Sequence, residues 1–348
     1  MSNPSESPPT HRPSFAKGWL KRVITIRDTP TYAEGLAFGA GCIGLILAAW
    51  WILTLGKEPI VDPFVLQTPK ETFGAFPALW ERELSRSILI SLVRVIAGFL
   101  LSASIGVPLG IIAGSYLRMN AFIKPVVLFG RSIPIAALIP LPLVWFGLGE
   151  FNKVMFIFLA TIAFVIFDTV NTVHAVPDRF VDTAYTLGAR PSRAKGLRIA
   201  GLAGLAYGLF IMLGWHLMRE DLTRTIGTEL ASAGAWYRFA AGFIGGFLLW
   251  YPIAGHQVMR KVMLPLALPD IVNSLRLIFG LAFGYIMLAE VINAKTGIGA
   301  LIITSQRRGY YAHIYLCLFI ISFIAWAIDR AIMLLQRQLF PHIKHGEN

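Results

Sequence analysis

Three ionisable residues, Arg94, Arg131 and Glu290, lie within stretches that are otherwise apolar enough to cross a membrane. A charge in hydrocarbon costs roughly 3 kcal/mol or more unless it has a partner or faces a water-filled path. Glu290 is taken as the only carboxylate well inside such a stretch. Arg94 and Glu290 can pair with each other to hold helices together, or they can line a path for a charged solute.

Arg131 is followed closely by three prolines, Pro134, Pro140 and Pro142. Proline lacks a backbone N–H and clashes with the preceding turn, so no straight helix accommodates all three. The sequence therefore predicts an opened or kinked span. A broken span that lines a cavity and a simple packing kink both explain the pattern.

A further candidate site is the polar segment that reads Val176-Pro-Asp-Arg-Phe-Val-Asp-Thr-Ala-Tyr-Thr-Leu-Gly-Ala-Arg190. Asp178 is suited to cap the start of a helix and Gly188 to end it in the left-handed conformation, so a helix of about ten residues is expected. One face of this helix is apolar and consists of Phe180, Ala184 and Leu187, with Val181 beside it. A helix this short needs a partner groove to be stable.

The composition predicts an all-α polytopic membrane protein. Of the 348 residues, 56% are apolar and 14% are charged, against roughly 25% charged residues in a soluble domain. Six apolar segments form the main expected spans, near residues 36–55, 88–116, 125–146, 154–173, 271–290 and 312–333. The net charge of +12 is spread over the loops between them, which argues against nucleic-acid binding.

Sequence motifs for chemistry by the chain itself are absent. No Gly-x-x-x-x-Gly-Lys-Ser/Thr phosphate loop occurs, and no His/Cys/Asp cluster has metal-ligand spacing, so neither an ATPase site nor a metal or other cofactor is expected. Cys42 and Cys317 are interpreted as packing residues. The distribution of Lys and Arg places both termini and the loop 174–198 in the cytoplasm. Within the basic N-terminal tail, residues 15–26 have the spacing of an interfacial helix.

The segment Asp182-Thr183-Ala184, followed by Gly188, resembles the Glu-Ala-Ala-x-x-x-Gly element of ATP-binding-cassette (ABC) importer permeases, with Asp for Glu and Thr for the first Ala. The hydrophobic-x-Leu-Pro step that completes this element matches Val262-Met-Leu264-Pro265. Other segments are similar to the nitrate/sulfonate/taurine-type branch of these permeases: Ser91-Leu-Val-Arg94-Val-Ile-Ala-Gly98, Arg131-Ser-Ile-Pro134 with Pro142-Leu-Val-Trp-Phe-Gly147, and Thr296-Gly-Ile-Gly299.

This resemblance implies a type I permease core of about six transmembrane helices in the bacterial inner membrane. It implies a transport subunit rather than an enzyme, which couples to two separate ATPase subunits, a second permease chain and an extracytoplasmic binding protein. A homodimer is the simpler case for the permease pair, and a paired paralogue is the alternative. The implied ATPase-coupling residues are Phe180, Asp182, Thr183, Ala184, Leu187, Gly188 and Pro265. The residues assigned to a translocation path are Arg94, Arg131, Pro134 and Glu290.

Roughly 60 extra residues separate the two halves of the coupling element, between Ala189 and Val262. The apolar runs 199–217 and 239–253 predict an inserted transmembrane hairpin with close-packing pairs at Gly204/Gly208 and Gly242/Gly246. A re-entrant or interfacial pair is the alternative. The expected division is a cytoplasmic tail (1–34), a first core part ending in the coupling helix (35–198), the insertion (199–256), a second core part (257–340) and a cytoplasmic tail (341–348).

Two other classes remain to be compared with this interpretation. A secondary transporter would show inverted repeats and several buried carboxylates, and a membrane-embedded enzyme would show a clustered catalytic group. ATP dependence of uptake separates the three classes. The substrate is expected to be a small anion such as nitrate, a sulfonate or taurine, because Arg94, Arg131 and Arg276 supply positive charge in or near the spans.

Overall fold

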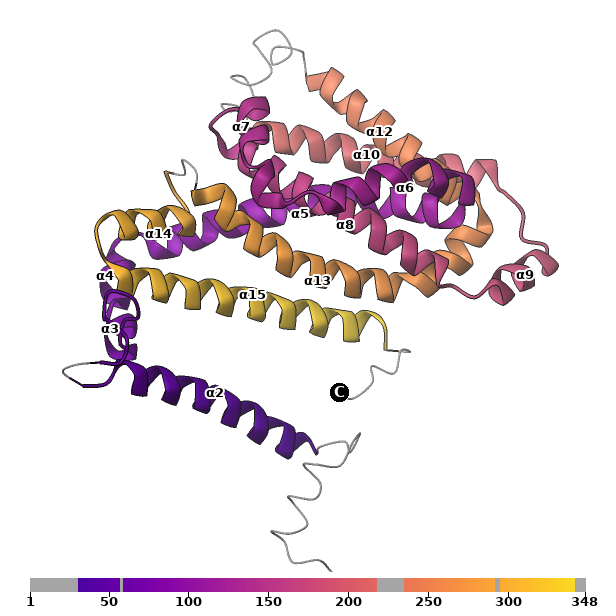
Figure 1. Ribbon diagram of the computed structural model, residues 1–348. Helices are drawn as coiled ribbons and strands as arrows, with labels where there is room; N and C mark the ends of the chain where they lie inside the picture. The colour runs from indigo at the N-terminus through magenta and orange to yellow at the C-terminus, as the bar shows by residue number, and fades with distance from the viewer. Residues whose placement is uncertain (1–30, 57–58, 218–234, 292–294, 342–348) are drawn as a thin grey trace, which may run out of the picture. The chain divides into compact units, whose positions relative to one another are not determined.

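The computed structural model describes residues 31–56, 59–217, 235–291 and 295–341, and every regular element in these ranges is a helix (Figure 1). The chain forms two compact units that divide after Lys70, and each is described by itself. The predicted interfacial helix at residues 15–26 and the C-terminal tail from residue 342 lie outside the described residues.

The first unit contains one long apolar helix, α2 (Tyr32–Thr54). Thr31 and Glu34 form a reciprocal capping box at its start: the Glu34 N–H donates to the Thr31 hydroxyl, and the Glu34 carboxylate accepts from the Thr31 N–H at 2.8 Å. Near its other end, the Trp50 indole donates to the Gln67 carbonyl at 2.9 Å. The predicted first span is therefore a helix with a well-defined start.

The second unit begins in the short helices α3 (Pro69–Gly74) and α4 (Phe76–Glu81). Its longer elements are α5 (Leu84–Ser115), α6 (Leu117–Ser132), α7 (Pro140–Phe146), α8 (Glu150–His174), α10 (Arg193–Leu217), α12 (Ala235–Gly255), α13 (Leu264–Val291) and α15 (Tyr311–Leu339). Between them lie the 3-10 turn η1 (Ile135–Leu138), the short helices α9 (Asp178–Thr186) and α14 (Ile298–Arg307), and the π-helical turn η2 (Met259–Met263).

Six helices in the described part of the chain are long and apolar enough to cross a membrane: α2, α5, α8, α10, η2 with α13, and α15. The pair formed by α6 and η1–α7 makes a seventh if it is one bent span. Five of the six main predicted spans are confirmed as helices of spanning length, and the remaining one, near residues 125–146, is this bent pair. The helix α12 is not among the six.

The predicted break of the third span is confirmed, with a bend of 94° between α6 and the following helical segment. Pro134 disfavours helical geometry at the residue before it, and Ile133 accordingly has an extended backbone with φ −72° and ψ 126°. Pro140 then starts α7 at a position where the missing N–H costs nothing.

Helices α5 and α8 pack in parallel at close range because glycines of α5 face branched side chains of α8. A Cβ atom on Gly110 would lie 2.5 Å from Thr169 Cβ, and one on Gly114 would lie 2.7 Å from Val173 Cβ. Gly98 and Gly106 approach α8 in the same way nearer its start. Phe99 continues the core to α13 through an edge-on contact with Phe279, with ring centroids 5.1 Å apart.

The inserted segment forms an antiparallel pair of helices, and its predicted glycine-mediated packing is confirmed. A Cβ on Gly204 would lie 2.7 Å from the Phe243 carbonyl oxygen, and one on Gly242 would lie 2.8 Å from that of Tyr207. Aromatic rings one helical turn apart stack along α12: Phe239, Phe243, Phe247 and Tyr251. The glycines of one helix thus accept the backbone and rings of the other.

The two ends of the insertion meet. The Ser192 N–H donates to the Gly255 carbonyl at 2.8 Å, and a Cβ on Gly196 would lie 2.9 Å from Gly255 Cα. The hairpin therefore starts at Arg193, six residues earlier than predicted. The first turns of α10 are basic, which is why the predicted start was placed after them. Long basic side chains can extend to water while their aliphatic parts cover apolar surface, so a helix can begin within a basic segment.

Whether this hairpin crosses the membrane can be tested at Thr225, which lies between its helices and outside the described residues. Single cysteines at Thr225, Arg190 and Tyr310 would be placed in a chain lacking Cys42 and Cys317. A crossing hairpin puts Thr225 on the side opposite to Arg190, so an impermeant thiol reagent should label it together with Tyr310. Labelling of Thr225 only under the conditions that label Arg190 would establish the re-entrant alternative.

Candidate functional sites at the two ends of the bundle

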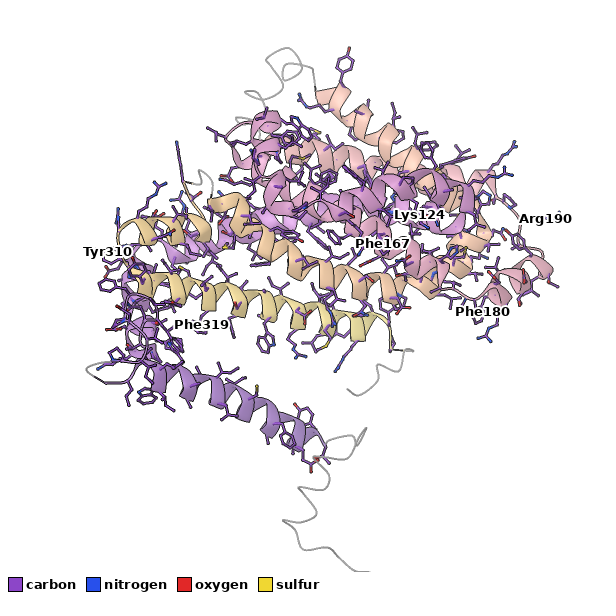
Figure 2. The ribbon with its side chains drawn as sticks, viewed as in Figure 1. Lys124, Phe167, Phe180, Arg190, Tyr310 and Phe319 are labelled. Atoms are coloured by element: carbon purple, nitrogen blue, oxygen red, sulfur yellow. The ribbon has the colours of Figure 1, made fainter. Side chains whose placement is uncertain are left out.

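Most of the sequence-predicted residues lie at two ends of the second unit, and Figure 2 places Tyr310 and Phe180 at these opposite ends. Tyr310 lies at the start of α15, next to α14, and Phe180 lies on α9. We call them the α14 end and the α9 end. The α14 end holds a buried charge cluster, and the α9 end holds an exposed helix beside a cavity.

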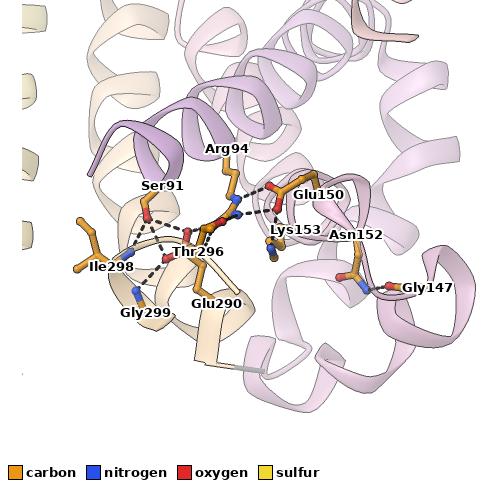
Figure 3. Close-up of polar contacts among 10 residues, drawn as sticks. All are labelled: Ser91, Arg94, Gly147, Glu150, Asn152, Lys153, Glu290, Thr296, Ile298 and Gly299. Atoms are coloured by element: carbon orange, nitrogen blue, oxygen red, sulfur yellow. Dashed lines mark hydrogen bonds and ion pairs between the residues drawn. The ribbon is translucent and has the colours of Figure 1, made fainter. Parts of the chain in front are cut away.

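Arg94 is the centre of the charge cluster and uses all five of its N–H donors (Figure 3). Two of them form a fork on Glu150, with Nε–Oε2 at 2.5 Å and Nη2–Oε1 at 2.6 Å. Nη1 donates to Glu290 Oε1 at 2.5 Å and to the Thr296 carbonyl at 2.8 Å. The last donor, on Nη2, reaches the Thr296 hydroxyl at 3.0 Å. The guanidinium therefore ties together α5, α8, α13 and the loop before α14.

Glu290 is saturated in the same way, although its side chain is fully buried. The Ser91 hydroxyl donates to both carboxylate oxygens, at 2.7 and 2.9 Å, and the Gly299 N–H donates to Oε2 at 2.9 Å. Ser91 in turn accepts from the Ile298 N–H at 2.9 Å. Two backbone N–H groups in the first turn of α14 thus find acceptors in the cluster.

Two members of the cluster, Glu150 and Lys153, were not found from the sequence. Glu150 is the first residue of α8, and Lys153 Nζ donates to it at 2.8 Å. Both residues stand at the start of an apolar run, where charges are ordinary, so only their contacts in the fold distinguish them. Lys153 is buried, whereas the Glu150 side chain is 46% exposed. Their spacing of three residues was the available signal. Together with Arg94 and Glu290 they balance two positive and two negative charges.

The two glycines of the Thr296-Gly-Ile-Gly299 motif have a steric role beside the cluster. Gly297 has a φ of +112°, and a Cβ there would lie 2.5 Å from Glu290 Oε1 and 2.6 Å from Arg94 Nη1. A Cβ on Gly299 would lie 2.5 Å from Glu290 Cβ. The backbone must approach the ion pair this closely, so only glycine fits.

The pairing interpretation of Arg94 and Glu290 is confirmed. The two residues are 2% and 1% exposed, so neither presents its charge to a water-filled path in this conformation. Arg276, the third arginine that favoured an anion, also has a partner: its Nε lies 3.2 Å from Asp329 Oδ1. These charges are neutralised within the protein.

Arg131 lies at the end of α6 and covers aromatic rings of α8. Its guanidinium carbon is 3.7 Å from the centroid of the Phe167 ring, a cation–π contact, and 5.4 Å from that of Phe164. Asp168, also on α8, is half-buried and interacts electrostatically with Arg131. The expectation that Glu290 is the only carboxylate inside a span was therefore wrong, because Asp168 lies well within α8.

At the α9 end, the predicted short helix is present as α9 (Asp178–Thr186). Gly188 ends it in the left-handed conformation with φ +80°. The Gly188 N–H donates to the Tyr185 carbonyl at 2.9 Å and the Ala189 N–H to the Ala184 carbonyl at 3.0 Å, which together form a Schellman motif. Asp178 is not the N-cap: Pro177 holds that position, and Asp178 is the first helical residue. Its charge there still favours the positive end of the helix dipole.

None of the residues of α9 is buried, and the helix presents two different faces. Phe180 and Leu187, 40% and 82% exposed, lie on the outer face. The hydroxyl of Thr183 bonds back to the Arg179 carbonyl at 2.6 Å, so it does not need an external partner. Asp182 is exposed, and Ala184 is half-buried.

The inner face of α9 lines a cavity of about 460 Å³. Asp178, Val181 and Tyr185 contribute from α9, and Met259 and Met263 from η2. The remaining lining comes mainly from the end of α5, the start of α6, the end of α8 and the segment between α12 and η2. The fold thereby brings together α9 and η2, the two segments that resemble the halves of the Glu-Ala-Ala-x-x-x-Gly element. Pro265 itself is exposed in the first turn of α13 and is not part of the cavity wall.

Tyr116 and His256 close one side of this cavity, with the phenol oxygen 3.3 Å from the imidazole Nδ1. His256 Nδ1 also lies 3.0 Å from the Pro252 carbonyl, which can only accept, so Nδ1 carries the hydrogen and the Tyr116 hydroxyl can donate to Nε2, 3.4 Å away. Partial burial raises the pKa of the Tyr116 phenol. In the described ranges, no group of three or more His, Cys, Asp or Glu side chains is placed to hold a metal ion.

The helices of spanning length and the buried, charge-balanced cluster define a multi-pass helical membrane protein. The sequence model of one family, described as "Binding-protein-dependent transport system inner membrane component", matches residues 106–251 and 253–345. The chain belongs to this family of ABC importer permeases, which confirms the predicted resemblance and disfavours the secondary transporter. As a member it is a transport subunit, and the family implies a partner ATPase and a substrate-binding protein.

Relatives cover nearly the whole chain. The taurine transport system permease protein TauC of Escherichia coli K12 is 23% identical over 88% of this chain and 89% of its own length. The bicarbonate transport system permease protein CmpB of Synechococcus elongatus is 24% identical over 95% and 96%. Among solved structures, the inward-facing MetNI methionine ABC transporter aligns with a TM-score of 0.51 at 17% identity, covering 75% of this chain and 97% of that chain, which supports the fold.

The charge cluster predicts a large difference between two glutamates. Replacing Glu290 with alanine leaves part of the buried Arg94 charge uncompensated, and the free energy of unfolding should fall by about 3–5 kcal/mol. Glu83 pairs with Arg86 at 3.0 Å in an exposed contact, and Glu83→Ala should cost about 0–1 kcal/mol. Denaturant titration of the purified chain in mixed micelles measures both. Similar losses for the two variants would contradict the structural role of the cluster.

Proposed function

We propose that this chain forms half of the translocation path of an ATP-driven importer and that α9 is the helix through which a separate ATPase moves it. The observation that carries the proposal is α9 itself, a helix defined at its end by a Schellman motif and lacking any buried residue. A nine-residue helix gains little from its own hydrogen bonds, so its outer face needs a partner to be stabilised.

The chemistry of the outer face fits a protein groove. Phe180 and Leu187 offer apolar anchors on this face. Asp182, which is also exposed, adds a negative charge on another side of the helix, because residues two positions apart point in nearly opposite directions. The cavity lies between α9 and the ends of the neighbouring helices, and α9 also contacts η2. This arrangement allows α9 to move with a bound ATPase while the Schellman motif keeps its shape.

The charge distribution supports an orientation for the proposal. The segment that leaves α9 is basic, with Arg190, Arg193, Lys195 and Arg198, so the α9 end faces the cytoplasm. The α14 end then faces the extracytoplasmic binding protein, and both termini are cytoplasmic. Two ATPases and a second permease chain, in the simpler case an identical one, complete the complex.

The proposed substrate is a small anion. The argument comes from the relatives, whose names specify taurine and bicarbonate, both of which carry an acidic group. Arg94 and Arg276 no longer support it, because each is paired with a carboxylate. The ligand of the binding protein encoded beside this chain would identify the substrate.

Gly188 tests the coupling role. Valine at a φ of +80° is strained at a cost of roughly 1 kcal/mol or more, so Gly188→Val should distort α9 and lower substrate-stimulated ATP hydrolysis. Asp182→Lys should lower it through reversed charge. Gly309 has a similar φ of +73° with open space around it, but it lies at the α14 end, so Gly309→Val is the matched control.

The measurement is made on the purified complex in lipid, whose mass also reports the number of permease chains. Hydrolysis stimulated to the same extent in Gly188→Val, Asp182→Lys and Gly309→Val would remove the coupling role from α9. A mass with a single permease copy would exclude the two-chain complex.

We also propose that the bent segment after Arg131 lines the path. Arg131 is only partly buried and Pro134 is exposed at the bend, whereas Arg94 and Glu290 are sealed in the cluster. The translocation role assigned to those two residues is therefore replaced by a role in holding the α14 end together.

Arg131→Ala should reduce uptake more than assembly. Arg131→Lys should recover part of it, since the charge near Asp168 is kept while the planar contact with Phe167 weakens. Arg118, an exposed arginine at the start of the same helix, provides the control Arg118→Ala. Uptake per assembled complex decides the question, and equal uptake by Arg131→Ala and Arg118→Ala would favour a packing role.

A further inference from the structure

Helix α5 contains a proline in its interior, Pro108, which is buried. Proline has no backbone N–H, so the carbonyl four residues earlier, that of Ser104, loses its helical donor. In a membrane-spanning helix no water is available to replace this bond, and a free carbonyl is costly. The residue that supplies the missing donor is therefore of interest.

That donor comes from the inserted hairpin. The Tyr207 hydroxyl, on α10, donates to the Ser104 carbonyl. A hydrogen bond from α10 thus reaches the proline site of α5.

The Tyr207 ring is held in place by the packing of the hairpin. A Cβ on Gly246 would lie 2.8 Å from the Tyr207 Cβ and Cγ atoms, and a Cβ on Gly242 would lie 2.8 Å from its carbonyl oxygen. The two glycines of α12 therefore fix where the side chain leaves α10. The hydroxyl points to Ser104 with little freedom to turn elsewhere.

The position of Pro108 along α5 gives this contact its functional meaning. Towards one end, α5 carries Ser91 and Arg94 of the charge cluster, and at the other end Gly114 and Ser115 line the cavity beside α9. A weakened turn at residues 104–108 lies between the two sites. Bending there would change the alignment of one end relative to the other.

We propose that Tyr207 is a positioning residue: it replaces the hydrogen bond that Pro108 removes, so that the inserted hairpin braces α5 between the charge cluster and the α9 end. The expected effect on the stability of the chain depends only on the hydrogen bond between Tyr207 and Ser104. The transport consequence rests on the proposed function of α9 as the coupling helix.

A double-mutant cycle between Pro108 and Tyr207 tests the brace. Tyr207→Phe removes only the hydroxyl, and Pro108→Ala restores the N–H that can pair with Ser104 within α5. In the wild-type background, Tyr207→Phe should lower the ratio of folded to unfolded chain roughly threefold to tenfold, the range of a hydrogen bond between membrane helices. In the Pro108→Ala background, the same change should have little effect.

Tyr237→Phe is the matched control, since Tyr237 lies on the hairpin helix α12 with its side chain 75% exposed. It should leave the ratio unchanged in both backgrounds. An equal loss from Tyr207→Phe in both backgrounds, or no loss in the wild type, would overturn the proposal.

The transport readout uses the same four chains assembled with their ATPase and binding protein in lipid. The ratio of substrate-stimulated to basal ATP hydrolysis should fall in Tyr207→Phe and recover in the double variant. A mere loss of hairpin packing would not be rescued by a change on α5. If Gly188→Val has no effect while the stability cycle behaves as expected, the coupling role of α9 fails and the brace stands.

Pro108→Ala is itself a change in a buried position, so a second measurement guards against its failure to assemble. Hydrogen exchange of the backbone at residues 104–112 should accelerate in Tyr207→Phe relative to the wild type, while exchange in α13 stays the same. Unchanged exchange at residues 104–112 would overturn the proposal without the proline variant.

Discussion

A guanidinium can be buried in apolar surroundings only where its charge is balanced and each of its N–H groups has an acceptor. Arg94 meets this condition with two carboxylates and Thr296, and the acceptors come from segments far apart in the sequence. Much of the α14 end follows from this requirement. The loop after α13 must bring its backbone against the ion pair, which explains two glycines, and α14 must start where Glu290 and Ser91 can accept its N–H groups.

The close contact of α5 with α8 connects this cluster to the rest of the molecule. Glycines on α5 let the two backbones approach over four turns, so a displacement of one helix is carried by the other. Both helices end beside the cavity behind α9. The fold therefore places the closely packed pair α5 and α8 between the charge cluster at the α14 end and the short helix α9, which has no buried residue.

Much of this could be predicted from the sequence, and the limits have physical causes. Some sequence features act on the local backbone alone. Apolar runs of spanning length predicted the long helices, the prolines after Arg131 predicted the bend, and Gly188 predicted the end of α9. The partners of Arg94 were only partly predictable. Glu290 stands out inside a span, whereas Glu150 and Lys153 lie at a helix start where charge is unremarkable. Only the fold shows that Glu150 pairs with both Arg94 and Lys153. The role of Tyr207 could not be predicted, because aromatic residues are common in membrane helices and only the structure shows its hydroxyl bonded to the Ser104 carbonyl.

The hydrogen bond between Ser192 and Gly255 has a consequence for how such a chain can acquire length. When the first and last residues of an inserted segment are in contact, the segment lengthens the chain but does not move its flanking parts away from each other. The parts before and after it therefore keep their relative positions. The two halves of the coupling element can then be separated in the gene and still adjoin in space. An insertion whose ends are joined in this way leaves the positions of the flanking helices unchanged. The added helices α10 and α12 also give the protein additional surface.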